Sequence, residues 1–224
     1  MITARDNPLW LQFWRDQRTD FHQTEVNDLL ARFWPKLHHV PGSLIFVPLC
    51  GKSLDMLWLA DQGHQVIGVE LSPVAVSAFF SENGLRAKRR RTGKFVLWQH
   101  QNIRILCGDF FALTKSDLGA IDLVYDRASL TALPEDLRAL YVAKLRSLIA
   151  PHISIFLLTT EEGQATSAAI DTEIKTLFSA DFAITLTHAE NSFEPNSNPV
   201  DSLPQAIEYK VYQLSPTPID LLPG

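Results

Sequence analysis

Residues 44–70 read LIFVPLCGKSLDMLWLADQGHQVIGVE and contain the pattern that decides the fold. The apolar runs at residues 44–47 and 65–69 predict two strands. Between the two runs, apolar residues recur at helical spacing up to Gly63, a typical helix stop. A strand, a helix and a second strand of these lengths predict a βαβ unit, in which the two strands lie parallel in one sheet.

The same alternation continues along most of the chain. We expect helices from Ser72, a typical N-cap, to Gly84 and from residue 134 to residue 148. Further strands are expected at residues 103–107, 121–125, 152–158, 182–186 and 206–212. The last two have no clear helix between them and are interpreted as an antiparallel closing pair. The sequence therefore predicts an α/β fold with a doubly wound, mostly parallel sheet, and a helical N-terminal extension at residues 1–40.

Composition and charge exclude several classes of protein. The chain has 224 residues, 46% of them hydrophobic, and can bury the core of one domain. Its formal net charge of -5 argues against a dedicated nucleic-acid binder, and no apolar run approaches the ~20 residues of a membrane span. The first twenty residues mix charged and aromatic side chains, unlike a signal peptide. We expect a cytoplasmic protein without nucleic-acid or membrane partners.

The cysteines and histidines give no metal or disulfide signal. Cys50 and Cys107 form no CxxC motif, and the seven histidines form no HxH or HxxxH pair. We therefore expect no metal. The basic run at residues 88–91 with Lys94 is interpreted as a solvated loop between a helix and a strand.

Glycines and charged residues follow four consecutive expected strands. They are Gly51, Glu70, residues 108–109 and residues 126–127. Ligands of open parallel sheets bind beyond the carboxyl ends of the strands, and a carboxylate about 20 residues after the glycine turn is typical of ribose binding. Each feature alone also fits ordinary turn chemistry, so the residues by themselves leave the two interpretations about equal. Because GxGxxG and GxxxxGK[ST] are both absent, a nucleoside without phosphates, above all S-adenosylmethionine, is favoured over NAD and ATP.

Several long stretches resemble the thiopurine S-methyltransferase family. The resemblance lies in Trp10, Trp14, residues 21–22, 46–56, 58–60, 63–64, 69–72, 107–111 and 126–134. It implies a class I S-adenosylmethionine-dependent methyltransferase fold, with a Rossmann-like seven-stranded sheet whose last strand is antiparallel. It also implies one methyltransferase domain over residues 1–224, divided into a lid at 1–40, a cofactor-binding core at 41–160 and a substrate-side part at 161–224.

The resemblance also implies roles for individual residues. Trp10 would cover the cofactor with help from Phe21, Leu49 would contact its methionine moiety through the backbone, and Glu70 would bind the ribose diol. Arg127 would face both cofactor and substrate and is the expected catalytic residue. The remaining cofactor-binding residues carried over from the family motifs are Gly51, Asp109 and Phe110.

The implied reaction is the direct in-line transfer of a methyl group to an aromatic or heterocyclic thiol such as a thiopurine, with S-adenosylhomocysteine as the product. One departure leaves the acceptor open, because residues 159–166 stand where many family members carry Gly-Pro-Pro-Phe. Methylation of selenium or tellurium oxyanions, as in metalloid detoxification, is one alternative, and a catalytically silent S-adenosylmethionine-binding protein is another. A dinucleotide oxidoreductase is disfavoured by the missing GxGxxG. We expect a monomer with a small-molecule thiol or metalloid substrate.

Overall fold

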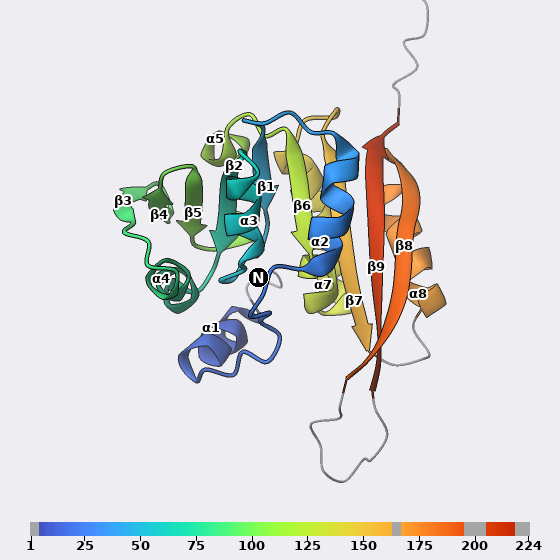
Figure 1. Ribbon diagram of the computed structural model, residues 1–224, viewed down its shortest axis with the longest axis horizontal. Helices are drawn as coiled ribbons and strands as arrows, with labels where there is room; N and C mark the ends of the chain where they lie inside the picture. Colours follow the sequence, from blue (N-terminus) through green and yellow to red (C-terminus); the bar gives the residue numbers. More distant parts are fainter. Residues whose placement is uncertain (1–4, 163–166, 195–204, 218–224) are drawn as a thin grey trace, which may run out of the picture. The chain divides into compact units, whose positions relative to one another are not determined.

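The chain divides after Tyr125 into two compact units, residues 1–125 and 126–224. The computed structural model describes residues 5–162, 167–194 and 205–217 (Figure 1). The division into parts at residues 40 and 160 stays a prediction.

The first unit is built on parallel strands in the order β5-β2-β1-β6. Strands β1 and β2 pair from Leu44 opposite Gln65 to Val47 opposite Gly68, which confirms the βαβ unit. Their central residues are buried, as expected for parallel strands covered on both faces. The elements are β1 (Leu44–Val47), α3 (Asp55–Asp61), β2 (Gln65–Glu70), α4 (Pro73–Glu82), β5 (Ile103–Cys107), η3 (Phe110–Ala112), α5 (Lys115–Leu118) and β6 (Leu123–Arg127), the last of which crosses the boundary.

Helix α4 begins as the sequence predicts. The Ser72 hydroxyl accepts a hydrogen bond from the Ala75 amide at 3.3 Å, and Pro73 occupies the first helical position. Because the Ser72 side chain satisfies one of the unpaired amides of the first turn, the helix starts directly after β2.

The basic run forms a strand, so the interpretation as a solvated loop is wrong. The described residues contain all seven expected strands and two more, β3 (Lys88–Thr92) and β4 (Phe95–His100), which form an antiparallel hairpin at the edge beside β5. Four of the five β3 residues are exposed, so the strand lacks the apolar alternation by which strands are recognised. Charged side chains on such an edge oppose pairing with another chain.

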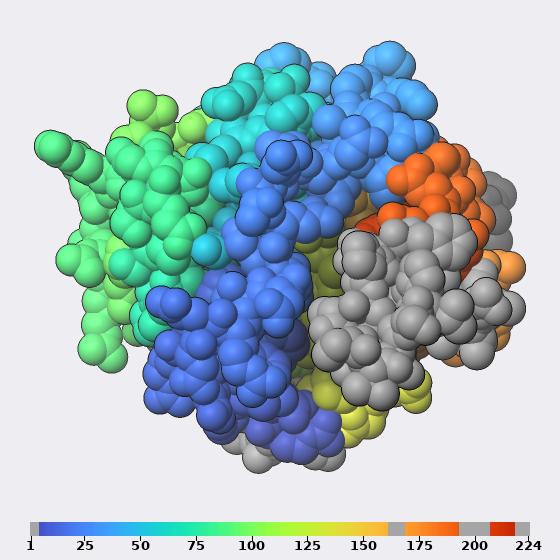
Figure 2. All heavy atoms as spheres, turned by 60° about the horizontal axis from the view of Figure 1, so that its bottom comes forward, coloured from blue at the N-terminus to red at the C-terminus, as the bar shows by residue number. Residues whose placement is uncertain are grey.

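The N-terminal residues are helical as expected, in α1 (Asn7–Arg15), α2 (Asp28–Phe33) and the 3-10 helix η2 (Trp34–Leu37). Helix α1 contacts α4, and its dark-blue residues lie beside the teal and green residues of the first unit in Figure 2. Trp34 and Phe33 are buried in the core. No described helix is long and apolar enough to cross a membrane.

In the second unit the strands follow the order β6-β7-β9-β8. Strand β9 is antiparallel to both β7 and β8, which confirms the closing pair. Residues 159–162 of the atypical segment continue β7, where Thr159 lies opposite Lys210, while residues 163–166 lie outside the described residues. The elements are α6 (Ser129–Ala132), α7 (Glu135–Leu148), β7 (Ser154–Glu162), α8 (Ser167–Phe178), β8 (Phe182–Glu194) and β9 (Gln205–Pro216).

A buried lysine fixes α8 to this sheet. The Lys210 ammonium on β9 lies 3.0 Å from the Asp171 carboxylate of α8 and 3.2 Å from the Glu208 carboxylate. The Tyr212 hydroxyl also donates to Asp171. Two carboxylates around one buried ammonium offset the cost of removing that charge from water.

Candidate functional site

The carboxylate of Glu70 stands at the end of β2 and is held by the glycine turn. Its Oε2 accepts a hydrogen bond from the Gly51 amide at 3.0 Å, and its Oε1 accepts one from the Ser72 amide at 2.7 Å. The side chain is 7% exposed. The turn after β1 and the end of β2 therefore meet at one edge of the sheet, as the sequence predicts.

Burial raises the pKa of Glu70 to about 7, although the amides of Ser72, Gly51 and Leu71 favour the ionised form. Removal from water disfavours the charged carboxylate more than these amides favour it. The amides also orient the carboxylate at this strand end. A carboxylate that titrates near neutral pH at the carboxyl end of a parallel sheet is a candidate functional group.

The glycine turn has an unusual backbone. Leu49 and Gly51 both have positive φ values, 45° and 53°. A Cβ at Gly51 would lie 3.2 Å from the indole of Trp14, so the aromatic ring is seated directly against the turn. Lys52, the next residue, pairs with Glu82 of α4 at 2.8 Å. The turn is thus fixed by its own strand ends, by α4 and by Trp14.

The expected lid residues form one aromatic cluster in the first unit. Phe21 makes edge contacts with Trp10 and Trp14 at centroid distances of 5.5 and 5.4 Å. Trp14 is buried, Trp10 is half-buried and Phe21 is exposed. The structure therefore connects both expected lid residues to Gly51 through Trp14, a residue that the sequence suggests only by its family spacing.

Asp109 and Phe110 follow β5 at the same edge of the sheet. The Asp109 carboxylate accepts from the Phe111 amide at 2.9 Å and caps η3. It also accepts from the side-chain amide of Asn7 at 3.3 Å, which connects the start of α1 to the end of β5. Asn7 carries no sequence signal for this contact, because the two residues lie 102 positions apart.

The two cysteines near Glu70 are poor nucleophiles. Burial, followed by the charge of Glu70, raises the pKa of Cys50 well above its usual value and the pKa of Cys107 to about 11. The Cys50 thiol lies against Gly68, where an added Cβ would be 2.6 Å from the sulfur. Since the thiolate is the nucleophilic form, both thiols serve packing here.

Arg127 belongs to the second unit, where its surroundings hold its backbone in place. The residue is half-buried, and the following Ala128 has a left-handed backbone with φ 59° and donates its amide hydrogen to Leu158 O at 2.8 Å. Next to Arg127, the buried Asp126 carboxylate accepts from the Tyr141 hydroxyl at 2.6 Å. Burial raises the pKa of Asp126 to about 6, although hydrogen bonds from Tyr141, Ser129 and Leu130 favour its ionised form.

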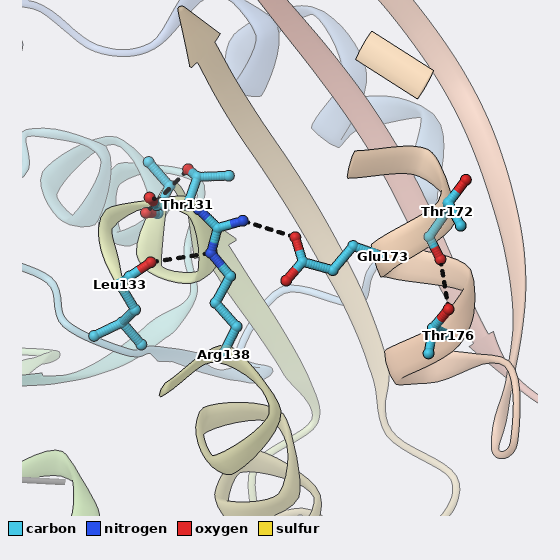
Figure 3. A network of polar contacts seen from close by, with 7 residues as sticks. Thr131, Leu133, Arg138, Thr172, Glu173 and Thr176 are labelled. Atoms are coloured by element: carbon cyan, nitrogen blue, oxygen red, sulfur yellow. Dashed lines mark hydrogen bonds and ion pairs between the residues drawn. The ribbon is translucent and has the colours of Figure 1, made fainter. Parts of the chain in front are cut away.

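Arg138 ties the segment after Arg127 to α8 (Figure 3). Its guanidinium donates to Leu133 O at 3.0 Å, to Thr131 O at 3.4 Å and to the Glu173 carboxylate at 2.7 Å. A planar guanidinium can make these bonds in three directions at once, which an ammonium of the same charge does less well. Hydrogen bonds of residues that precede and follow Arg127 in the sequence therefore fix the backbone around it.

No group of three or more His, Cys, Asp or Glu side chains in the described part of the chain is placed to hold a metal ion. The assignment of the site residues to cofactor and substrate stays a prediction.

Comparison with known proteins agrees with this architecture. A family model described as Thiopurine S-methyltransferase (TPMT) matches residues 5–217. A thiopurine S-methyltransferase of Stutzerimonas stutzeri is 54% identical over 96% of this chain and 92% of its own length. One of Pseudomonas putida KT2440 is 40% identical over 92% of this chain and 97% of its own length.

Solved structures of low sequence identity share the fold. An Anabaena variabilis S-adenosylmethionine-dependent methyltransferase has a TM-score of 0.60 and 17% identity, and covers 93% of this chain and 94% of its own. A Burkholderia thailandensis 1,6-didemethyltoxoflavin-N1-methyltransferase, solved with S-adenosylhomocysteine, has a TM-score of 0.59 and 13% identity. The match covers 92% of this chain and 86% of that protein. The fold is the class I methyltransferase fold expected from the sequence.

Proposed function

The chain belongs to the thiopurine S-methyltransferase family, and we propose that it transfers a methyl group from S-adenosylmethionine to the sulfur of thiopurines and related aromatic thiols. The proposal is carried by one observation, the buried Glu70 carboxylate fixed by the glycine turn at the end of β2. The other parts of the site support it.

The residues of the first unit fit the nucleoside part of S-adenosylmethionine. An ionised carboxylate has about four acceptor sites and no donor, and ribose hydroxyls are donors. The amides of Gly51, Ser72 and Leu71 face the Glu70 carboxylate and occupy up to three of these acceptor sites, which leaves at least one for a ribose hydroxyl. The single glycine of the turn offers few amides, which suits a ligand without phosphates.

S-adenosylmethionine supplies an activated methyl group on a positively charged sulfur. The protein has to bind the donor, align the acceptor sulfur behind the methyl group and exclude water, because proximity and alignment account for much of such a rate. We assign the exclusion of water to Trp10, Trp14 and Phe21. No general base is required for an acceptor that is already a thiolate.

We assign to Arg127 the binding of the anionic acceptor. The planar fork of a guanidinium can orient a heteroaromatic ring or pair with a thiolate. The support is its place in the family motif at residues 126–134 and the fixed backbone around it, through Asp126, Ala128 and Arg138.

Transfer of labelled methyl from S-adenosylmethionine tests the proposal directly. The acceptors are a mercaptopurine, a simple aromatic thiol, selenite and tellurite, with heat-inactivated protein as the control. Transfer to the mercaptopurine supports the proposal. Transfer only to selenite or tellurite would redirect it to metalloids, and cofactor binding without any transfer would favour the silent binder.

We further propose that the chain acts as a monomer in the cytoplasm. Size-exclusion chromatography with light scattering checks the oligomeric state, and a mass near 25.2 kDa is the expected result.

A further inference from the structure

A fully buried carboxylate in α3 connects three segments of the first unit. Asp55 is 0% exposed. Its Oδ1 accepts a hydrogen bond from the Asn27 amide at 2.8 Å, and its Oδ2 accepts one from the Tyr125 hydroxyl at 2.8 Å. The Asp55 amide in turn donates to the Ser53 hydroxyl at 3.3 Å. A charge that only marked the start of a helix would stay solvated, so this geometry calls for another role.

The Asn27 contact fixes the end of the aromatic N-terminal segment. Asn27 is the N-cap of α2, where its side-chain oxygen accepts from the Leu30 amide at 3.2 Å and its side-chain amide donates to Gln23 at 3.0 Å. Its backbone amide is the group that binds Asp55. The segment that contains the aromatic cluster therefore leads to Asn27, and the position of Asn27 depends on its hydrogen bond to Asp55.

The other end of the same segment rests on the glycine turn. Trp14 lies against Gly51, and Gly51 donates its amide to Glu70. Asp55 lies four positions after Gly51, in the first turn of the helix that this turn begins. Residues 51–55 thus include both Gly51, against which Trp14 packs, and Asp55, which binds the Asn27 amide.

The Tyr125 contact fixes Asp55 from the side of the sheet. The Tyr125 ring is fully buried and makes an edge contact with Trp34 at 6.1 Å, and the Trp34 indole donates to His64 at 3.3 Å. With its carboxylate oriented by a hydroxyl from β6, Asp55 presents a fixed acceptor to Asn27.

From this arrangement we propose that Asp55 is a positioning residue, which holds the aromatic cover formed by Trp10, Trp14 and Phe21 over the glycine turn through the Asn27 amide. The inference rests on the proposed function for its effect on catalysis. Loss of the hydrogen bond between Asp55 and Asn27 makes the aromatic cover more mobile, so S-adenosylmethionine is bound less tightly. The groups that contact the acceptor are unchanged.

Two variants separate this role from a general loss of stability. Asp55→Asn keeps one acceptor oxygen, replaces the other with a donor and removes the charge, so the bond from the Asn27 amide is weakened from a charged to a neutral hydrogen bond. Tyr125→Phe removes only the hydroxyl that orients the Asp55 carboxylate and keeps the acceptor oxygen for the Asn27 amide, so its effect should be smaller than that of Asp55→Asn. Leu118→Ala in α5, a buried residue with no part in this cluster, is the matched control for lowered stability. All three are compared at a temperature well below their melting points.

The first readout is hydrogen exchange of the α1 amides, which needs no activity. Asp55→Asn should speed exchange in residues 7–15 about tenfold, the effect of weakening a charged hydrogen bond to a neutral one, with little change in β5. Leu118→Ala should leave α1 exchange within about twofold of the parent protein, and Tyr125→Phe should give an acceleration between those of Leu118→Ala and Asp55→Asn. Equal acceleration in all three, or none in Asp55→Asn, would overturn the proposal.

The second readout is the split between KM and kcat. Asp55→Asn should raise the KM for S-adenosylmethionine about tenfold while kcat with saturating donor changes less than about threefold. A fall in kcat with unchanged KM would contradict the positioning role. If the parent protein transfers no methyl group, the proposed function fails, and the exchange experiment still decides the role of Asp55.

A measurement on the parent protein covers the case in which Asp55→Asn does not fold. The Asn27 amide should exchange as slowly as the amides of α3, because both belong to one buried cluster. Exchange of the Asn27 amide at the rate of an unprotected amide in an unfolded chain would overturn the proposal.

Discussion

Lowering the pH from 8 to 6 should weaken S-adenosylmethionine binding about tenfold, because Glu70 must be ionised to accept hydrogen bonds from the ribose hydroxyls. Burial raises the pKa of this carboxyl to about 7. The carboxylate is therefore about 90% ionised at pH 8, about half ionised at pH 7 and about 9% ionised at pH 6. If only the ionised form binds the diol, the apparent Kd rises in inverse proportion to these fractions.

The assay is isothermal titration calorimetry at pH 6, 7 and 8 with constant ionic strength. Glu70→Gln is the test variant, because it keeps the size of the side chain and removes the titration. The donor itself titrates, and this contribution is the same for both proteins, so the ratio of their Kd values isolates Glu70. Glu135→Gln, an exposed carboxylate in the first turn of α7, is the matched control.

The ratio of the Glu70→Gln Kd to the parent Kd should be largest at pH 8 and should shrink about tenfold by pH 6. A constant ratio would refute the assignment of Glu70 to the ribose. Glu135→Gln should follow the parent protein at every pH.

The same shift predicts how stability without ligand depends on pH. The folded-state pKa of Glu70, about 7, lies above its ordinary value of 4.5, so between these values the folded protein retains a proton that the unfolded chain has lost. The contribution of Glu70 to stability is therefore present below pH 4.5 and is lost as the pH rises toward 7. In thermal melts between pH 4.5 and pH 7, the melting temperature of the parent protein should fall relative to that of Glu70→Gln.

Three further changes test other parts of the structure. Arg127→Lys keeps the charge and loses the planar fork, so kcat in the methyl-transfer assay should fall by tenfold or more. The Kd for S-adenosylmethionine, measured by calorimetry, should change less than about twofold. Activity equal to that of the parent protein would contradict the catalytic role of Arg127. Tyr141→Phe should cost about 1–3 kcal/mol in urea unfolding, with a larger loss at pH 8 than at pH 5, because the hydroxyl stabilises the ionised Asp126 whose pKa is about 6. Gly108→Ala would place a Cβ 2.5 Å from the Phe95 ring and should destabilise the chain by about 1–3 kcal/mol; unfolding at the parent urea midpoint would contradict that packing.

Local signals in the sequence predicted where seven of the nine described strands lie along the chain, and the edge of the sheet where the candidate site lies. Apolar runs and helical spacing located all seven expected strands, and Ser72 marked the start of α4. Since parallel strands end at one edge, the meeting of Gly51 and Glu70 followed from their places after β1 and β2. The hairpin β3–β4 was missed because its edge strand is exposed on both faces, which removes the apolar alternation.

The sequence by itself determined the fold class and the family, because these depend on periodicity and on motifs that lie within short stretches, and the same motifs supply the predicted site residues. Only the tertiary structure decided that Trp14 seats on Gly51, that Asn7 reaches Asp109 and that Asp55 joins Asn27 to Tyr125. These contacts join residues up to 102 positions apart. A buried carboxylate and a solvated one have the same letter in the sequence, and packing between distant segments decides which of the two Asp55 is.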